Sequence, residues 1–173
     1  MPSYVHCGHA PSLRPNCGTR LLAAASYGGR VQDSYNLERF VSAQNDGGLY
    51  VRALHELRRG QKTGHWMWFV FPQVAGLGMS ELSQFYGIGS LAEARAFLNH
   101  PVLGARLVEC ATAVAGVADL TAEQILGEID AMKLRSSMTL FHRAAPDEPL
   151  FPQVLDRFFA GIPDMQTDRI LGK

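Results

Sequence analysis

The stretch EIDAMKLRSSMTLFH, residues 128–142, decides the fold, because its apolar residues repeat at the spacing of an α-helix. On a helical wheel of about 100° per residue, one arc collects apolar side chains and should be buried. The apolar members of this arc are Ile129, Leu134, Met138, Leu140 and Phe141. Arg135, Thr139 and His142 fall on the opposite arc, where we expect solvent. The stretch therefore predicts a long helix with one face in the core.

Three polar residues, Asp130, Lys133 and Ser137, lie within the same apolar arc. A buried carboxylate and a buried ammonium each cost several kcal/mol in desolvation unless they pair or meet a ligand. The helix does not need these groups for its polar face, which lies on the other side. Two interpretations stay open: a half-buried Asp130–Lys133 pair with Ser137 bonded to a nearby carbonyl, or a ligand site.

Helical spacing recurs along most of the remaining chain. Apolar residues repeat at intervals of three and four within residues 36–43, 50–57, 94–98, 103–114 and 154–159. Thr121 and Gln124 fit a capping box at the start of a further helix. The sequence thus predicts a mainly α, compact multihelical domain of six or seven helices, with one or two short extended segments around residues 66–71.

The aromatic stretch HWMWFVFPQ, residues 65–73, favours a short buried strand or extended segment, because it is apolar on both alternating faces and ends at a proline. In such a segment Trp66 and Trp68 share one face, which is suited to stacking on a base. His65 opens the segment, and Gln73 would read the polar edge of the base. Core packing is the competing interpretation for the aromatic side chains, and we expect one tryptophan to be core and the other partly exposed.

A glycine-rich turn follows this segment. Gly76, Gly78 and Ser80 precede a short helix predicted to run towards Tyr86. Backbone N–H groups of such a turn can bind a phosphate, so Gly78 and Ser80 are candidate ligand contacts. The turn lacks the lysine of a P-loop, which favours an ordinary turn with Ser80 as the helix N-cap.

Composition limits the classes of function. The 173 residues carry no formal net charge, and their Lys and Arg are dispersed, which argues against binding of duplex nucleic acid. The apolar runs are too short to span a membrane, and the sequence shows no secretory signal, so we expect a cytoplasmic protein. Three cysteines are an odd number, which argues against a disulfide framework. His6, Cys7, His9 and Cys17 lack the second half of a zinc site, so we predict no metal and no cofactor.

The domain organisation follows from where periodicity starts. Residues 1–34 are rich in Gly, Pro, Ser and small residues without sustained periodicity, and we interpret them as a flexible N-terminal extension that can be deleted without loss of stability. Residues 35–173 should form a single globular domain.

Several motifs taken together resemble a known family. They are GQKTGHWMWFVFPQ (60–73), GLGMS (76–80), YGI (86–88), HPVLGARL (100–107) and DAMKLRSSMTLF (130–141). This series is similar to the bacterial domain of unknown function 1810 family, over roughly residues 35–167. That family resembles in structure the NADAR (YbiA-like) proteins, which are multihelical and act on N-glycosidic bonds of ADP-ribose-type compounds. Asp130, Lys133 and Met138 look like the late helix of NADAR proteins, whereas their early Glu-His pair has no counterpart here.

The resemblance implies two alternative functions. In the first, the protein hydrolyses the N-glycosidic bond of an ADP-ribosyl or related nucleotide ligand, and Asp130 and Lys133 are catalytic. Asp130 would stabilise positive charge at the ribosyl carbon or activate water, and Lys133 would contact a phosphate or attack an opened ribose. In the second, the same pocket belongs to a non-catalytic nucleotide-binding module. A small-molecule nucleotide is the expected partner in both.

Overall fold

The first turn of the domain is set by Asp33, whose carboxylate accepts hydrogen bonds from the Leu37 and Glu38 N–H groups at the start of the first helix. The computed structural model describes residues 33–172. The predicted N-terminal extension, residues 1–34, falls almost wholly outside the described residues, as do His6, Cys7, His9 and Cys17. Cys110 is the cysteine that lies within residues 33–172, and it is buried and forms no disulfide.

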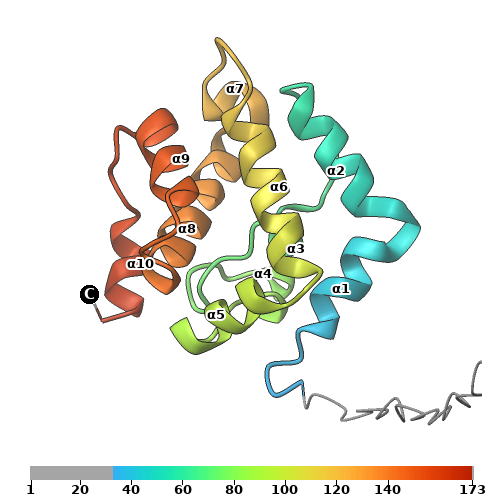
Figure 1. Ribbon diagram of the computed structural model, residues 1–173, viewed down its shortest axis with the longest axis vertical. Helices are drawn as coiled ribbons and strands as arrows, with labels where there is room; N and C mark the ends of the chain where they lie inside the picture. The colour runs from blue at the N-terminus through green and yellow to red at the C-terminus, as the bar shows by residue number, and fades with distance from the viewer. Residues whose placement is uncertain (1–32, 173) are drawn as a thin grey trace, which may run out of the picture. The chain divides into compact units, whose positions relative to one another are not determined.

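The described chain is mainly helical, as predicted, with ten α-helices and one 3-10 helix. In chain order they are α1 (Glu38–Asn45), η1 (Asp46–Gly48), α2 (Leu49–Arg58), α3 (Met67–Val70), α4 (Glu81–Phe85), α5 (Leu91–Asn99), α6 (Leu103–Ala115), α7 (Ala122–Leu126), α8 (Glu128–Ala144), α9 (Leu150–Phe159) and α10 (Met165–Ile170) (Figure 1). None of these helices is long and apolar enough to cross a membrane.

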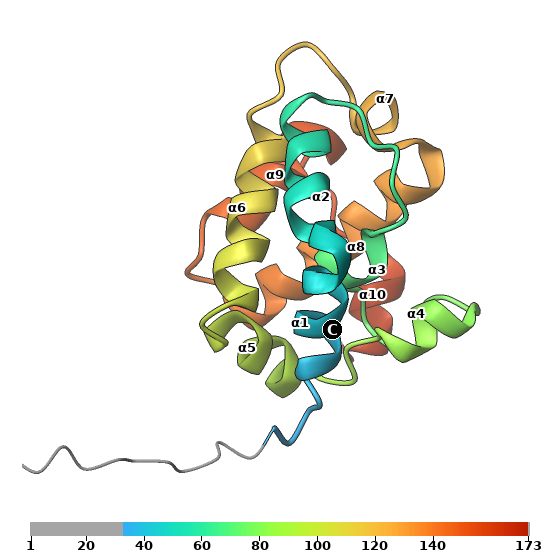
Figure 2. The same ribbon diagram turned by 90° about the vertical axis from the view of Figure 1, so that its right-hand side faces the viewer.

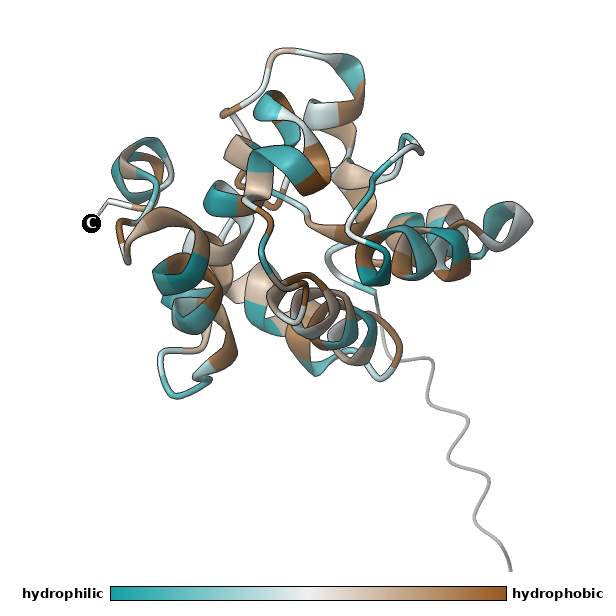
Figure 3. Ribbon diagram, turned by 90° about the horizontal axis from the view of Figure 1, so that it is seen from above, coloured by the Kyte–Doolittle hydropathy of each residue, from teal (hydrophilic) through white to brown (hydrophobic). Residues whose placement is uncertain are grey.

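Helix α8 forms the centre of the core and packs against α5, α7, α9 and α10. Phe141 joins three of these helices, because its ring centroid lies 5.4 Å from that of Phe97 on α5 and 5.8 Å from that of Phe151 on α9. Most helices carry polar and apolar residues side by side, as amphipathic helices do (Figure 3). In contrast, α4 extends away from the other helices (Figure 2), and its Leu82 and Phe85 are exposed.

The centre of the aromatic stretch is helical, which corrects the expected extended segment. Met67–Val70 form α3, and the Phe71 N–H donates to the Met67 carbonyl at 2.9 Å. Aromatic residues favour strands only where a neighbouring strand can pair with them. Within residues 33–172 the single β-bridge joins Val74 to Ile88, so the stretch has no partner strand.

The buried face of α8 also differs from the helical wheel. Ile129, expected in the core, is 65% exposed, whereas Thr139, expected in solvent, is fully buried. The Thr139 hydroxyl donates to the Arg135 carbonyl at 2.8 Å and accepts from the Asp164 N–H at 2.8 Å. A helical wheel does not predict the burial of these residues, because the surroundings of α8 change along its length. Its first turn meets solvent, and its later turns are enclosed by other helices.

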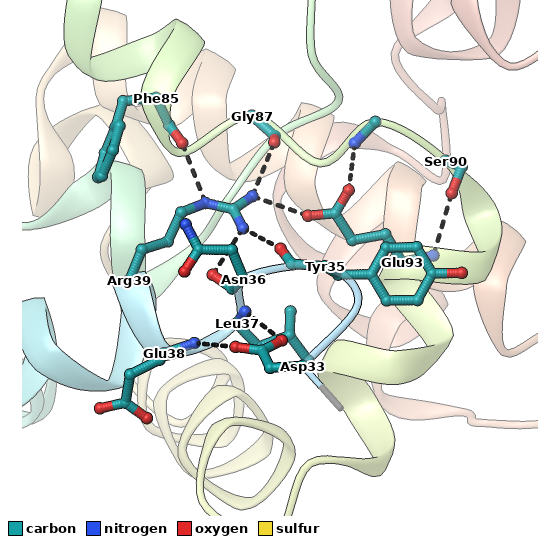
Figure 4. A network of polar contacts seen from close by, with 11 residues as sticks. Asp33, Tyr35, Asn36, Leu37, Glu38, Arg39, Phe85, Gly87, Ser90 and Glu93 are labelled. Carbon is teal, nitrogen blue, oxygen red and sulfur yellow. Dashed lines mark hydrogen bonds and ion pairs between the residues drawn. The ribbon is translucent and has the colours of Figure 1, made fainter. Parts of the chain in front are cut away.

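A buried charge cluster ties α1 to α5 and to the segment before α5 (Figure 4). Arg39 and Glu93 form an ion pair at 2.7 Å, and each side chain is 10% exposed. The other oxygen of Glu93 accepts the Gly89 N–H at 2.8 Å. The remaining donors of the guanidinium bind four backbone carbonyls, those of Tyr35, Asn36, Phe85 and Gly87.

Candidate functional site

Asp130 lies between two lysines. Lys62 Nζ is 2.6 Å from Asp130 Oδ2, and Lys133 Nζ is 2.8 Å from Asp130 Oδ1. Burial by itself raises the pKa of the Asp130 carboxyl, but the hydrogen bonds and charges of Lys133 and Lys62 outweigh burial and lower this pKa below its usual value. Asp130 is therefore ionised at neutral pH, and the three side chains together carry one excess positive charge.

Lys62 comes from the loop between α2 and α3, far from α8 in the sequence. Its backbone N–H donates to the Ile125 carbonyl of α7 at 2.8 Å, which anchors the loop beside the start of α8. Its ammonium also donates to the Gly64 carbonyl at 2.6 Å and lies 5.0 Å from the centre of the Trp66 ring. We did not predict Lys62 as a site residue, because a loop lysine has no periodic pattern that marks it.

Glu56 on α2 holds this loop in place. It is only 8% exposed, and its carboxylate accepts hydrogen bonds from the N–H and hydroxyl of Thr63, the N–H of Gly64 and the indole N–H of Trp66, at 2.8–2.9 Å. Burial raises the pKa of Glu56, but these four donors outweigh burial and lower the pKa to about 2. The sequence signal for Glu56 is its position on the buried face of α2, next to Leu57.

Lys133 and Asp130 line an open cavity of about 490 Å³. Its walls also include Trp68, His65 and the start of α8; the full lining is His65, Trp68, Leu126, Gly127, Glu128, Ile129, Asp130 and Lys133. Lys133 Nζ lies 4.6 Å from the centre of the Trp68 ring, within the range of a cation–π contact. Glu128 is exposed, and no residue among 33–172 pairs with its carboxylate. The cavity thus combines an aromatic ring, an ammonium and a carboxylate that has no partner among the described residues.

The start of α8, which lines this cavity, leaves backbone N–H groups without helix partners. Gly127 precedes the helix with φ of 82° and provides no side-chain cap. The hydrogen-bond ladder of the helix begins with the Ala131 N–H, which donates to the Gly127 carbonyl at 2.9 Å. The N–H groups of Glu128, Ile129 and Asp130, in the first turn of α8, are therefore not used by the helix itself. The positive end of the helix dipole lies at the same wall and favours an anionic ligand group.

The two tryptophans have different surroundings, as expected. Trp66 is fully buried, with its indole bonded to Glu56, whereas Trp68 is partly exposed in the cavity. A buried ring has no face open to a ligand, so the stacking role expected for Trp66 does not hold in this structure. The reason is that α3 begins between them: Trp66 is its N-cap and Trp68 its second residue, so the two rings do not share a face as they would on a strand.

Four other predicted site residues do not line this cavity. Ser80 caps α4, where its hydroxyl accepts the Ser83 N–H, as the alternative of an ordinary turn predicted. Gly78 packs against the same Ser83, and the Gln73 carbonyl accepts the Ile88 N–H. Ser137 is fully buried in α8, and its hydroxyl has no partner among residues 33–172. Over the same residues, no three His, Cys, Asp or Glu side chains could hold a metal ion together.

Comparison with known proteins places the chain in a family. No curated protein matches it. The crystal structure of the conserved hypothetical protein Rv1873 from Mycobacterium tuberculosis at 1.38 Å is similar, with 47% sequence identity and a TM-score of 0.77. The match covers 79% of this chain and 96% of that one. The model of a family described as "Protein of unknown function (DUF1810)" matches residues 34–171. The chain therefore belongs to the DUF1810 family.

Proposed function

We propose that the cavity at the start of α8 binds a nucleotide-type ligand, of which an ADP-ribosyl compound is the best candidate. The observation that supports this most is the position of Lys133, whose ammonium in the cavity wall lies 2.8 Å from an Asp130 oxygen and 4.6 Å from the centre of the Trp68 ring. An aromatic ring beside a cation suits a base attached to a phosphate. The similarity of the Asp130, Lys133 and Met138 helix to NADAR proteins suggests the ADP-ribosyl class.

The cavity offers a protein group for each part of such a ligand. The cavity volume of about 490 Å³ lies within the range of small-molecule sites. Trp68 would stack on the base, and Lys133 with the first N–H groups of α8 would bind phosphate oxygens. The exposed carboxylate of Glu128 would accept hydrogen bonds from ribose hydroxyls.

Hydrolysis of the N-glycosidic bond is the second candidate, and Glu128 favours it, because its exposed carboxylate has no partner within residues 33–172. Both oxygens of Asp130 are held by lysines, which makes Asp130 a poor acceptor for a proton from water. Glu128 would take that proton as the water oxygen bonds to the ribosyl carbon. The bond to the base nitrogen breaks with its electron pair on nitrogen, which then receives the proton. Asp130 would contribute negative charge near the positive ribosyl carbon.

Calorimetric titration with ADP-ribose tests the binding proposal. We expect ADP-ribose to bind the wild type and to raise its melting temperature, and we expect Lys133→Met to weaken binding at least about tenfold, or about 1.4 kcal/mol. Trp68→Ala should weaken it as well. Arg59→Met is the matched control, because it removes one positive charge from an exposed side chain at the end of α2. If neither ADP-ribose nor ADP binds the wild type, the proposal is wrong.

Glu128→Gln separates binding from hydrolysis. If the protein is a hydrolase, this variant should keep the affinity for an ADP-ribosyl N-glycoside within a few-fold and lose release of the free base, measured by chromatography. Wild-type protein that binds the compound without releasing the base would identify a non-catalytic binding module.

A further inference from the structure

The two lysines that hold Asp130 differ in how many of their donors are already used. Lys62 has three partners: Asp130, the Gly64 carbonyl and the Trp66 ring. Its side chain is 9% exposed and does not line the cavity. Lys133 has Asp130 and the Trp68 ring, is 21% exposed, and forms part of the cavity wall. An ammonium has three N–H donors, so Lys133 retains donors for which residues 33–172 supply no hydrogen-bond acceptor besides Asp130.

We infer that Lys133 leaves Asp130 to bind the anionic group of the ligand, and that Lys62 is a positioning residue that keeps Asp130 paired when this happens. The inference rests on the proposed function, since it concerns the same cavity and ligand. It assigns separate roles to two residues of the same type.

The physical reason is the cost of an unpaired buried charge. If Asp130 had one counter-ion, a ligand that attracted Lys133 would leave a half-buried carboxylate without a partner, and binding would be weakened by that cost. With two counter-ions, each on a different oxygen, one can leave while the other remains. The excess positive charge of the cluster is thus available to an anion from solution.

The loop geometry supports a fixed Lys62. Its backbone is bonded to α7, and the adjoining Thr63 and Gly64 are bonded to Glu56. Other titratable groups near Asp130 are His65 and Glu128, which line the cavity, and Glu56 behind the loop. Affinities for ADP-ribose are therefore compared at one pH, so that titration of these groups does not contribute to the differences between variants.

A double-mutant experiment with ADP-ribose at pH 7.5 tests whether Lys133 leaves Asp130 for the ligand. Lys62→Met leaves Asp130 and the ligand to compete for Lys133, so we expect the affinity to fall at least tenfold. Adding Asp130→Asn to this variant removes the competitor and restores the original net charge. We expect Lys62→Met/Asp130→Asn to bind within about threefold of wild type. A purely structural Lys62 predicts no rescue, because the second substitution does not repair the loop.

Titration of Asp130 by carbon-13 NMR in the ligand-free protein provides a second, independent measurement. In Lys133→Met, the Asp130 carboxyl should still titrate below the usual range of an aspartate, because Lys62 remains. In Lys62→Arg the affinity for ADP-ribose should stay near wild type, because the charge is retained. If Asp130 titrates normally in Lys133→Met, or if Asp130→Asn gives no rescue, the inference is overturned. If the wild type binds neither ADP-ribose nor ADP, the proposed function fails, and the titration still decides whether Lys62 holds Asp130.

Discussion

The Arg39–Glu93 cluster and the Lys62–Asp130–Lys133 cluster are both largely shielded from solvent, yet they are built differently. In the first, all five N–H groups of the guanidinium have acceptors, and both oxygens of Glu93 have donors. In the second, two ammonium groups share one carboxylate, and the lysine with unused donors lines a cavity. A closed set of partners serves the fold, whereas an excess charge beside a cavity is suited to a ligand.

The largest effect should come from breaking the closed cluster. Arg39→Met leaves the buried Glu93 without its counter-ion and removes the donors to four carbonyls, so we expect a loss of about 3–5 kcal/mol in the free energy of unfolding. Urea denaturation measures this, with Arg59→Met as the control for net charge. A loss below about 1 kcal/mol would show that the cluster contributes little to the fold.

Glu56 should give the next largest effect, and it depends on pH. Its pKa is about 2 in the folded protein against 4.5 ordinarily, so its stabilisation is complete above pH 4.5 and is lost as the pH falls towards 2. The shift corresponds to about 3 kcal/mol at neutral pH. Glu56→Gln should therefore lower stability at pH 7 and flatten its dependence on pH between 7 and 3. Glu123→Gln, at an exposed carboxylate on α7, should leave that dependence unchanged.

The smallest effect is expected at Lys133. Lys133→Met leaves Asp130 paired with Lys62, so we expect the free energy of unfolding to change by less than about 1 kcal/mol, whereas Lys62→Met should cost more. Both are compared by urea denaturation at pH 7. A cost of about 3–5 kcal/mol for Lys133→Met would mean that the lysines act as one structural unit, like the Arg39–Glu93 cluster.

The sequence revealed part of the site because α8 is strongly periodic. Asp130 and Lys133 stood out as charges among apolar residues, and the structure pairs them at 2.8 Å. Ser137 stood out as a polar residue on the same apolar arc, but it is enclosed in the core away from the cavity. A wheel cannot tell these cases apart, because it gives direction around the helix axis and not position along it.

What the sequence did not reveal came from contacts between distant segments. Lys62 and Glu56 act through a loop whose path is set by individual hydrogen bonds, and such bonds leave no repeating pattern. The helical fold followed from periodicity over many residues, but the four-residue helix α3 was too short for its period to outweigh its aromatic composition.

The different surroundings of Trp66 and Trp68 have a spectroscopic consequence. These are the two tryptophans of the chain. Trp66 is enclosed and bonded to Glu56, so its emission should stay constant, whereas Trp68 faces an ammonium at 4.6 Å. Withdrawal of that charge alters the electric field at the indole and shifts its fluorescence. The fluorescence of Trp68 therefore reports the position of the Lys133 ammonium, and Trp66, two residues away, serves as an internal reference.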